Sequence, residues 1–387
     1  MSDWKKVMLG DIAQIIGGGT PSTKVEEYWN GEISWLTPRD LTGYTNKFIS
    51  KGERNITEDG LKNSSARMMP KGTVLMTSRA PIGYIAIAEK ELCTNQGFKS
   101  FIVDEDIIDN EFLYYQLKAN VERIKSLGSG STFAEVSGSV LKGIEIEIPV
   151  LPTQKEIAQI LSSLDDKIEL NLQMNQTLEA MAQAIFKEWF VDFNFPGFDG
   201  ELVDGLPKGW RNAALGDVTT LIAGGDKPND FSEQPNEHNG VPIYSNGISN
   251  EGLYGYTKKP RIIEESVTVS ARGTIGFVCL RLRPYFPIVR LISVIPKSEI
   301  LTAKYLYYWL INQNISGTGT TQQQLTVPDF GRFNILIPDI HVVAEFTTIV
   351  DAFYQKIDEN KTQIKSLTQT RDTLLLKLMS GQLEVKK

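Results

Sequence analysis

The chain has 387 residues, of which 41% are hydrophobic and 22% are charged, as is ordinary for a globular protein of two or three compact units. No apolar run approaches the roughly 18–20 residues that a membrane helix needs, and the amino-terminal stretch lacks the apolar core of a signal peptide. We therefore expect a cytoplasmic protein, in which Cys93 and Cys279 pack as small apolar residues rather than pair.

The net charge of −7 argues, by itself, against nucleic-acid binding. The charge is unevenly distributed, however. Residues 258–304 hold nine basic and three acidic side chains, and residues 39–79 hold eight basic and four acidic ones. Residues 151–190, by contrast, hold three basic and six acidic side chains. Because phosphate contacts depend on local charge, the two basic stretches are candidate nucleic-acid contacts.

The first 151 residues are predicted to form a β-rich mixed domain. Frequent turn residues and β-branched side chains predict strands at 72–78, 83–88 and 99–103. The apolar spacing of residues 110–125 predicts a helix, with Tyr114 and Tyr115 facing the core.

A long helix is predicted over residues 152–190. After Pro152 no Gly or Pro interrupts it, and apolar residues recur in steps of four and three, as in a coiled-coil seam. Thr153, with Glu156 three residues later, has the pattern of a capping box and predicts the start of the helix. Residues 191–209, which are rich in Gly, Pro and Asp, are predicted to be a linker.

The second half of the chain repeats the first in the same order. "TSRAPIGY" (77–84) is matched by "SARGTIGF" (270–277), and "EFLYYQL" (111–117) by "KYLYYWL" (304–310). This indicates a tandem duplication with about 190 residues per unit. It predicts a second β-rich domain over 210–338 and a second long helix within 339–387, which Gly381 ends.

The predicted fold class is α+β: two β-rich mixed domains separated by two long helices, which form an antiparallel coiled coil with pseudo-two-fold symmetry. A shift of 189 residues maps the first heptad pattern onto the second and Asn171 onto Asn360, where a buried Asn would fix the register. The predicted seam residues are Leu161, Leu164, Ile168, Asn171, Leu178 and Ile185 in the first helix, and Val350, Phe353, Ile357, Asn360, Leu367 and Leu374 in the second.

The sequence contains no recognisable catalytic or metal-binding pattern. His238 and His341, the two histidines, lie in unrelated contexts, and CxxC and HExxH are absent. The glycine-rich "IIGGGTP" (15–21) lacks the Lys-Ser/Thr of a phosphate-binding loop and is interpreted as a turn. We therefore expect a binding protein without a metal or cofactor of its own. An enzyme with an unrecognised site is the less favoured alternative, because His and Cys are scarce.

At the start of each repeat the sequence resembles the DNA-specificity subunit of type I restriction–modification systems. The resemblance lies in "WKKVMLGD" (4–11), "WRNAALGD" (210–217) and "LPKGW" (206–210), and in "IPVLPTQKEIAQIL" (148–161) leading into a long helix. It covers the whole chain and rests on the repeated architecture more than on one motif. The second helix departs from it, because "IPDIHVVAEFTTIV" lacks the Pro-x-x-Glu/Gln pattern of the first.

This resemblance implies that residues 1–151 and 210–338 are target-recognition domains, each reading one half of a bipartite site in double-stranded DNA. The helices would hold the half-sites apart and dock two modification (methyltransferase) subunits. The chain itself would not be an enzyme. S-adenosylmethionine would be used by the modification subunits, and ATP and magnesium by partner subunits that include the restriction (translocase and nuclease) subunits.

The predicted DNA contacts lie on the repeated loop and in the basic stretches. Arg79 and Arg272 occupy the same place in the two copies, and an arginine can donate two hydrogen bonds to guanine or to a phosphate. A surface ion pair is the competing interpretation. Gly83 and Gly276 are predicted to allow a close approach of the backbone to the duplex. Further predicted contacts are Arg39, Gln96, Asn246, Gln322, Lys258, Lys259, Arg281 and Arg283.

A second function class remains open at this point. The same pattern of two domains and two helices fits a coiled-coil adaptor that binds no nucleic acid. An adaptor predicts little dependence of any binding on salt, whereas a DNA-binding protein loses affinity steeply as salt rises.

Overall fold

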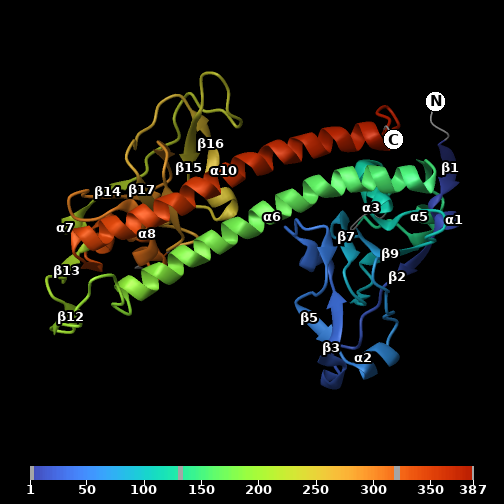
Figure 1. Cartoon of the computed structure of the whole chain (residues 1–387), viewed down its shortest axis with the longest axis horizontal. Coiled ribbons are helices and arrows are strands. Elements are labelled where there is room, and N and C mark those ends of the chain that lie inside the picture. Colours follow the sequence, from blue (N-terminus) through green and yellow to red (C-terminus); the bar gives the residue numbers. More distant parts are fainter. Residues whose placement is uncertain (1–3, 130–133, 318–322, 386–387) are drawn as a thin grey trace. The chain divides into compact units, whose positions relative to one another are not determined.

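The computed structural model describes residues 4–129, 134–317 and 323–385 and forms two compact units (Figure 1). Unit 1 comprises Met1–Met174 and Glu359–Lys387, and unit 2 comprises Asn175–Asp358. Both long helices, α6 (Leu151–Phe190) and α10 (Ile340–Met379), contribute residues to both units. The mixture of short strands and two long helices confirms the predicted α+β class.

Unit 1 is built on three antiparallel or mixed sheets. The largest has the spatial order β2 (Ala13–Gly17), β9 (Phe98–Val103), β6 (Val74–Ser78), β7 (Ile82–Ala88), β4 (Phe48–Ile49). The others are β5 (Arg54–Ile56), β3 (Trp29–Leu36), β8 (Cys93–Thr94), and the pair β1 (Lys5–Met8) with β10 (Glu145–Ile148). The short helices are α1 (Leu9–Ile12), α2 (Glu58–Lys62), α3 (Asn110–Ala119), α4 (Val121–Ser126), α5 (Gly138–Lys142), and the 3₁₀ turns η1 (Glu26–Tyr28) and η2 (Pro38–Leu41).

Unit 2 repeats this order of strands. Its four-stranded sheet runs β14 (Thr219–Ala223), β20 (Ile292–Pro296), β17 (Ser266–Val269), β18 (Val278–Arg281). Its other sheets are β16 (Leu253–Thr257), β15 (Val241–Tyr244), β19 (Phe286–Pro287), and the pair β13 (Arg211–Ala214) with β21 (Asn334–Ile337). Its short helices are α7 (Leu215–Val218), η3 (Ser249–Gly252), α8 (Ala303–Ile311) and α9 (Val327–Gly331). The matching order confirms the duplication.

The segment between the repeats has structure of its own. β11 (Leu202–Val203) and β12 (Leu206–Pro207) form a hairpin. Phe195 stacks on Trp210 with ring centroids 4.9 Å apart, and Phe193 contacts the same indole edge-on at 5.6 Å. Phe193 and Phe195 therefore anchor the segment 191–209 to Trp210 at the start of the second repeat.

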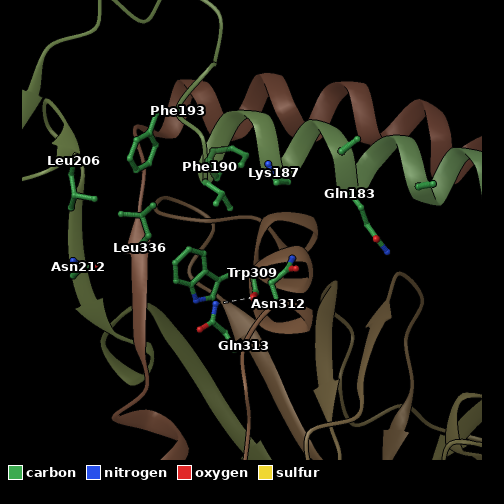
Figure 2. A pocket seen from close by; sticks show the side chains of 13 residues that line it. Gln183, Lys187, Phe190, Phe193, Leu206, Asn212, Trp309, Asn312, Gln313 and Leu336 are labelled. Carbon is green, nitrogen blue, oxygen red and sulfur yellow. Dashed lines mark hydrogen bonds between the residues drawn. The ribbon is translucent and has the colours of Figure 1, made fainter.

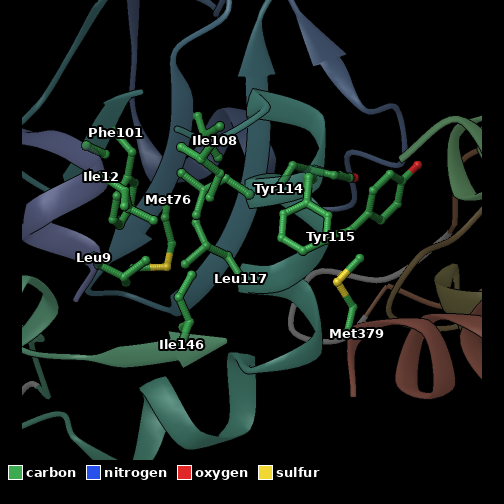
Figure 3. Close-up of a cluster of buried hydrophobic side chains, with 14 of the residues drawn as sticks. Leu9, Ile12, Met76, Phe101, Ile108, Tyr114, Tyr115, Leu117, Ile146 and Met379 are labelled. Atoms are coloured by element: carbon green, nitrogen blue, oxygen red, sulfur yellow. The ribbon is translucent and has the colours of Figure 1, made fainter. Parts of the chain in front are cut away.

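The core of unit 1 joins the sheet, α3 and the end of α10 (Figure 3). The side chain of Asp109 accepts a hydrogen bond from the Phe112 backbone N–H at 2.9 Å and so caps α3. Tyr114 and Tyr115 are buried, as predicted, and Met379 from the far end of the chain packs in the same cluster. Unit 1 therefore completes its core with residues of α10.

Unit 2 has the equivalent arrangement with the other helix ends. Phe186 and Phe190 near the end of α6 pack against Tyr305 on α8, with ring centroids 5.7 and 4.9 Å from its ring. Phe346 near the start of α10 meets Phe190 edge-on at 5.2 Å. The predicted seam residue Ile185 is half-buried, whereas its neighbour Phe186 is buried, so the apolar stripe at this end of α6 is wider than the heptad pattern indicated.

Within unit 1, the two helices run antiparallel. The side-chain amide of Asn171 donates to Gln363 at 2.8 Å, and Arg371 donates to Asp165 at 2.6 Å, so a step back along α6 is a step forward along α10. Of the twelve predicted seam residues, six are buried and the other six are half-buried. The buried ones are Leu161, Ile168, Asn171, Val350, Ile357 and Asn360, and the half-buried ones are Leu164, Leu178, Ile185, Phe353, Leu367 and Leu374.

The predicted capping box of α6 is wrong. The helix begins at Leu151, so Thr153 lies inside the first turn, where Pro152 is tolerated because the first N–H groups need no helical acceptor. The buried side chain of Gln154 anchors this end. Its amide donates to Ile107 and Pro149 carbonyls at 3.0 and 2.9 Å, and its oxygen accepts from the Asp109 N–H at 3.0 Å.

Asp165 joins three segments of unit 1. Its carboxylate accepts hydrogen bonds from Arg371 on α10 and, at 2.7 Å, from the Tyr115 hydroxyl on α3. Burial raises the pKa of Tyr115, and the nearby Asp165 carboxylate raises it further. Burial opposes the charge of Arg371, but the carboxylates of Asp165 and Asp372 outweigh it and hold the pKa of Arg371 above its usual value. Phenol and guanidinium thus both act as donors at this junction.

We expect Asp165→Ala to lower the free energy of unfolding of unit 1 by about 2 kcal/mol, because it leaves a half-buried guanidinium without its main partner. Arg371 is 16% exposed and Asp165 is 12% exposed. Asp372→Ala is the matched control: it removes the second partner of the same arginine, is 59% exposed, and is expected to cost less than about 1 kcal/mol. Hydrogen exchange of the α3 and α6 amides in the full chain measures both.

At the equivalent positions unit 2 has Tyr354 and Ala182 in place of Asp165 and Arg371. The double substitution Asp165→Tyr with Arg371→Ala copies that arrangement and is expected to recover most of the stability lost in Asp165→Ala. Equal losses in Asp165→Ala and Asp372→Ala would contradict this role for Asp165.

Candidate nucleic-acid interface

In each unit the repeated arginine lies on a rim of loops that extend from the ends of the sheet strands. Arg79 follows β6 directly, and Arg272 lies three residues beyond the end of β17. We call the two loop clusters rim 1 and rim 2. Rim 1 comprises residues 18–20, 78–79, 95–97 and 135–136. Rim 2 comprises residues 224–225, 246, 271–272, 288–290 and 324–325.

Rim 1 is held together by backbone hydrogen bonds. The Ser78 N–H donates to the Gly97 carbonyl at 2.7 Å, and the Ser78 carbonyl accepts from Val136 at 3.0 Å. The glycine-rich loop passes directly beneath, since a Cβ on Gly18 would lie 2.1 Å from the Asn95 carbonyl oxygen. Residues 15–17 belong to β2 and residues 18–21 form an irregular segment rather than a turn. The lack of side chains on the glycines lets two loops cross in contact.

Rim 2 repeats one of these two backbone hydrogen bonds, and in the other a side chain takes the place of the backbone acceptor. Leu325 donates to the Ala271 carbonyl at 3.0 Å, as Val136 does to Ser78. The Ala271 N–H, however, donates to the side-chain oxygen of Asn246 at 2.8 Å, and the Asn246 amide donates in turn to the Val289 carbonyl. Asn246, predicted as a base contact, thus uses its amide to bridge two loops of the rim.

The repeated arginines have different partners in the two rims. Arg79 lies 3.5 Å from the Glu135 carboxylate, which Lys99 also contacts at 3.2 Å. Arg272 donates twice to the side-chain oxygen of Gln324, at 3.1 and 2.7 Å. The arginine of rim 1 shares one carboxylate with a lysine, whereas a neutral amide orients the arginine of rim 2. Arg272 is therefore held in place with its charge intact.

Gly83 and Gly276 do not provide open backbone for a duplex. Both have a positive φ, +95° and +83°, which favours glycine. A Cβ on Gly83 would lie 2.4 Å from Val121 of α4, and one on Gly276 would lie 2.6 Å from the Ile315 carbonyl oxygen. The space beside each glycine is filled by the protein itself, so the glycines serve internal packing.

The other predicted contacts divide by exposure. Gln96 is exposed on rim 1 and accepts a hydrogen bond from Thr20. Arg39 is exposed on η2, beside Pro38, whose ring would lie 2.8 Å from a Cβ on Gly97 of rim 1. Lys258 and Lys259 are exposed after β16. Gln322 lies outside the described residues.

Arg281 is a structural residue in this fold, although its basic neighbourhood predicted a phosphate contact. Its side chain is 4% exposed. The guanidinium donates to Thr268 at 3.0 Å and to the Glu251 carbonyl at 2.6 Å, and lies 3.5 Å from the ring centre of Tyr244. It thereby fixes the η3 turn. Arg283, by contrast, is 75% exposed and forms an ion pair with Asp358 at 2.8 Å.

A groove of about 790 Å³ lies at the end of α6 in unit 2 (Figure 2). Its apolar lining includes Phe190, Phe193, Leu206, Trp309 and Leu336. In unit 1 the equivalent positions of Trp309 and Leu336 are Gln116 and Glu147, and the Gln116 amide donates to the Glu147 carbonyl at 2.8 Å. With these polar residues, unit 1 has a space of only about 240 Å³ at the equivalent place. The apolar groove is therefore a feature of unit 2.

Across the described ranges, no three or more His, Cys, Asp or Glu side chains gather in a way that could hold a metal ion. Nor does any helix, within those same ranges, combine the length and hydrophobicity that a membrane span requires. Cys93 and Cys279 are free and buried, and burial raises the pKa of each thiol to about 11.

Comparison with known proteins places this architecture. The family described as the type I restriction modification DNA specificity domain matches residues 1–180 and 207–369. The MjaIX specificity subunit of Methanocaldococcus jannaschii is 38% identical over 407 residues, which cover 99% of this chain and 94% of that one. The chain belongs to the family of type I restriction–modification specificity subunits.

Two further members of this specificity-subunit family agree over the full length. The HindI specificity subunit of Haemophilus influenzae is 27% identical over 472 residues, covering 99% of this chain and all of that one. The fold is similar to the crystal structure of a type I S subunit from M. genitalium, with a TM-score of 0.65, 19% identity, and coverage of 97% and 96% of the two chains. The resemblance seen in the sequence is confirmed.

Arg281→Met is expected to lower the free energy of unfolding of unit 2 by about 3 kcal/mol, because Thr268 and the Glu251 carbonyl lose a charged donor in a buried place. Hydrogen exchange of residues 249–252 and of β17 reports the change. Arg283→Met, two residues away and exposed, is the control and is expected to cost less than about 1 kcal/mol. If Arg281→Met weakened DNA binding without loosening η3, Arg281 would be a phosphate contact after all.

Proposed function

We propose that this specificity subunit reads a bipartite site in double-stranded DNA, with rim 1 on one half-site and rim 2 on the other. The observation that carries the proposal is the repetition of one loop assembly, with an arginine at the same place, in two units of the same strand order. A protein that reads two separate half-sites needs two such surfaces. An adaptor has no need of an arginine oriented by Gln324 with its charge intact.

The rims also have the chemistry that base reading requires. An arginine fork matches the O6 and N7 acceptors of guanine in the major groove, and amide side chains such as Gln96 match adenine. The exposed lysines Lys258 and Lys259, with Arg39 beside rim 1, would contact phosphates, which position a protein on DNA without reading sequence. Arg281 is left out of this surface because it is buried.

The helices are proposed to set the half-site spacing and to dock two modification subunits. Large apolar side chains are exposed along the outer faces of α6 and α10: Ile160, Leu170, Met181, Ile349 and Leu376. Exposed apolar surface of this kind is typical of a partner interface. The groove at the end of α6 would extend it in unit 2. The chemistry that uses S-adenosylmethionine and ATP would then belong to the modification and restriction subunits.

Substitution of each repeated arginine in turn tests whether each rim reads one half-site. In the complex with modification subunits, Arg272→Ala is expected to relax the readout of one base pair in one half-site by about tenfold or more, since a bidentate arginine–guanine contact is lost. Arg79→Ala should do the same in the other half-site only. Sequencing of methylated adenines in cells that carry each variant measures both.

Each variant is the control for the other, because the two arginines hold equivalent places. Loss in both half-sites from one substitution would contradict the assignment of one rim to each half-site. A single uninterrupted methylated motif, or DNA affinity that hardly changes with salt, would favour the adaptor instead.

The spacing role is tested by lengthening both helices. One heptad is inserted between Met174 and Asn175 of α6 and one between Asp358 and Glu359 of α10, where the two units divide. At 1.5 Å per residue the insertion adds about 10 Å, which corresponds to about three base pairs. The methylated motif should keep both half-sites and gain about three base pairs of spacer. An insertion in α6 alone breaks the pairing with α10 and is the control; an unchanged spacer in the double insertion would contradict the role.

A further inference from the structure

The turn at residues 288–290 of rim 2 has a strained backbone. Val289 and Arg290 are consecutive residues with positive φ, 52° and 61°. A β-branched residue such as Val rarely adopts this left-handed conformation, because its Cβ substituents crowd the backbone. Val289 is 51% exposed, and Arg290 is exposed as well. The strain therefore does not arise from burying either side chain in the core.

Neighbouring loops hold this turn in its conformation. The Val289 N–H donates to the Gly225 carbonyl at 2.8 Å, and the Arg290 N–H donates to the Gly224 carbonyl at 3.0 Å. The Ile288 N–H donates to the Tyr244 carbonyl at 2.9 Å, and the Asn246 amide donates to the Val289 carbonyl. Surroundings that over-determine a strained turn in this way are typical of functional sites. In rim 2 these hydrogen bonds hold the apolar side chain of Val289 in an exposed position.

The turn occupies the same place as a polar turn in unit 1. An offset of 193 residues pairs Val289 with Gln96 and Arg290 with Gly97, just as it pairs Arg272 with Arg79. Both turns adjoin the repeated arginine through the rim hydrogen bonds. The fold thus keeps the position and changes the chemistry from an amide to an apolar group, as two readers of different bases would require.

We propose that Val289 and Arg290 determine specificity in unit 2, with Val289 contacting the C5-methyl group of a thymine and Arg290 contacting a backbone phosphate beside it. The proposal rests on the proposed function, that rim 2 reads a half-site. The thymine methyl is the apolar group that base pairs present in the major groove, so an exposed valine held rigidly outward is matched to it. Arg290 has no ion-pair partner among the described residues and is free to meet a phosphate.

The experiment removes the methyl groups of the proposed contact, from the thymine in the DNA and from residue 289 in the protein. Once the bipartite motif has been mapped, duplexes are made in which each thymine of the two half-sites is replaced in turn by deoxyuridine, which lacks only the C5-methyl. Methylation by the intact complex is measured with the wild-type chain and with Val289→Ala. In the wild type, one replacement in the half-site read by unit 2 is expected to lower the rate about fourfold, the value of one buried methyl group.

With Val289→Ala, that same replacement should no longer matter, because the valine side of the contact is gone. Val203→Ala in the linker hairpin is the control; Val203 has the same 51% exposure and should leave the deoxyuridine pattern as in the wild type. Val289→Gly removes the strain as well as the side chain and should behave like Val289→Ala, with a melting temperature no lower than that of the wild type. This second variant separates a lost contact from a misfolded rim.

Two results would overturn the inference while leaving the proposed function intact. One is a half-site of unit 2 in which no deoxyuridine replacement changes the rate, or which contains no thymine, while Arg272→Ala still relaxes that half-site. The other is a sensitive thymine that stays sensitive in Val289→Ala. A methylated motif that is not bipartite would instead refute the proposed function itself.

Discussion

The half-buried contact between Asp165 and Arg371 joins residues that lie 206 positions apart in the chain and ties the two long helices of unit 1 together. Asp165 also holds Tyr115, so the contact docks α3 on the pair of helices. Side chains of α3 pack in one core with those of β6, and Arg79 follows β6 directly. A continuous packed path thus runs from the helix pair to rim 1. Packed interiors have low compressibility and therefore transmit displacements. The position of the helices thus affects the position of Arg79.

Unit 2 reaches the same arrangement with different chemistry. The Tyr308 hydroxyl lies 3.1 Å from that of Tyr354, where unit 1 has Tyr115 and Asp165. The ion pairs that involve α3 and its equivalent α8 differ between the units as well. In unit 1, Lys47 contacts Glu111 on α3 at 2.8 Å and Asp166 on α6 at 3.5 Å. In unit 2 the residue equivalent to Glu111 is a lysine, Lys304, which itself contacts Asp351 on α10 at 3.0 Å. A globular part placed on the wrong helix segment would bury unpaired charge. Two similar repeats in one chain therefore fold without exchanging partners.

The sequence predicted what depends on periodicity. Strands, helices and the duplication follow from local patterns and from self-similarity, and the structure has most of them where they were expected. The helix predicted over 110–125, however, is divided at Asn120 into α3 and α4. What a polar side chain does could not be predicted in the same way, because it depends on a partner distant in sequence. Arg281 looked like a phosphate contact because basic residues surround it, yet Glu251 and Tyr244 bury it. Asn246 looked like a base reader, and it bridges two loops. Val289 could not be singled out from the sequence, because the feature that distinguishes it is its positive φ angle, which only the structure shows.

The two rims differ in local charge, and under the proposed function this difference would affect how each meets DNA. In rim 1, Arg79 shares the Glu135 carboxylate with Lys99 of β9, whereas in rim 2 Arg272 lies beside the neutral Gln324, with Arg290 exposed nearby. At physiological salt a charge acts over about 8 Å, so each rim attracts phosphate according to its own residues rather than the net charge of −7. Rim 2 is therefore suited to early, sequence-independent contact. In rim 1, under the proposed function, Arg79 would exchange its contact with Glu135 for one with a base, and a guanine would supply two acceptors in return. The acidic partner would then weaken the attraction of rim 1 for phosphates and increase its discrimination between bases.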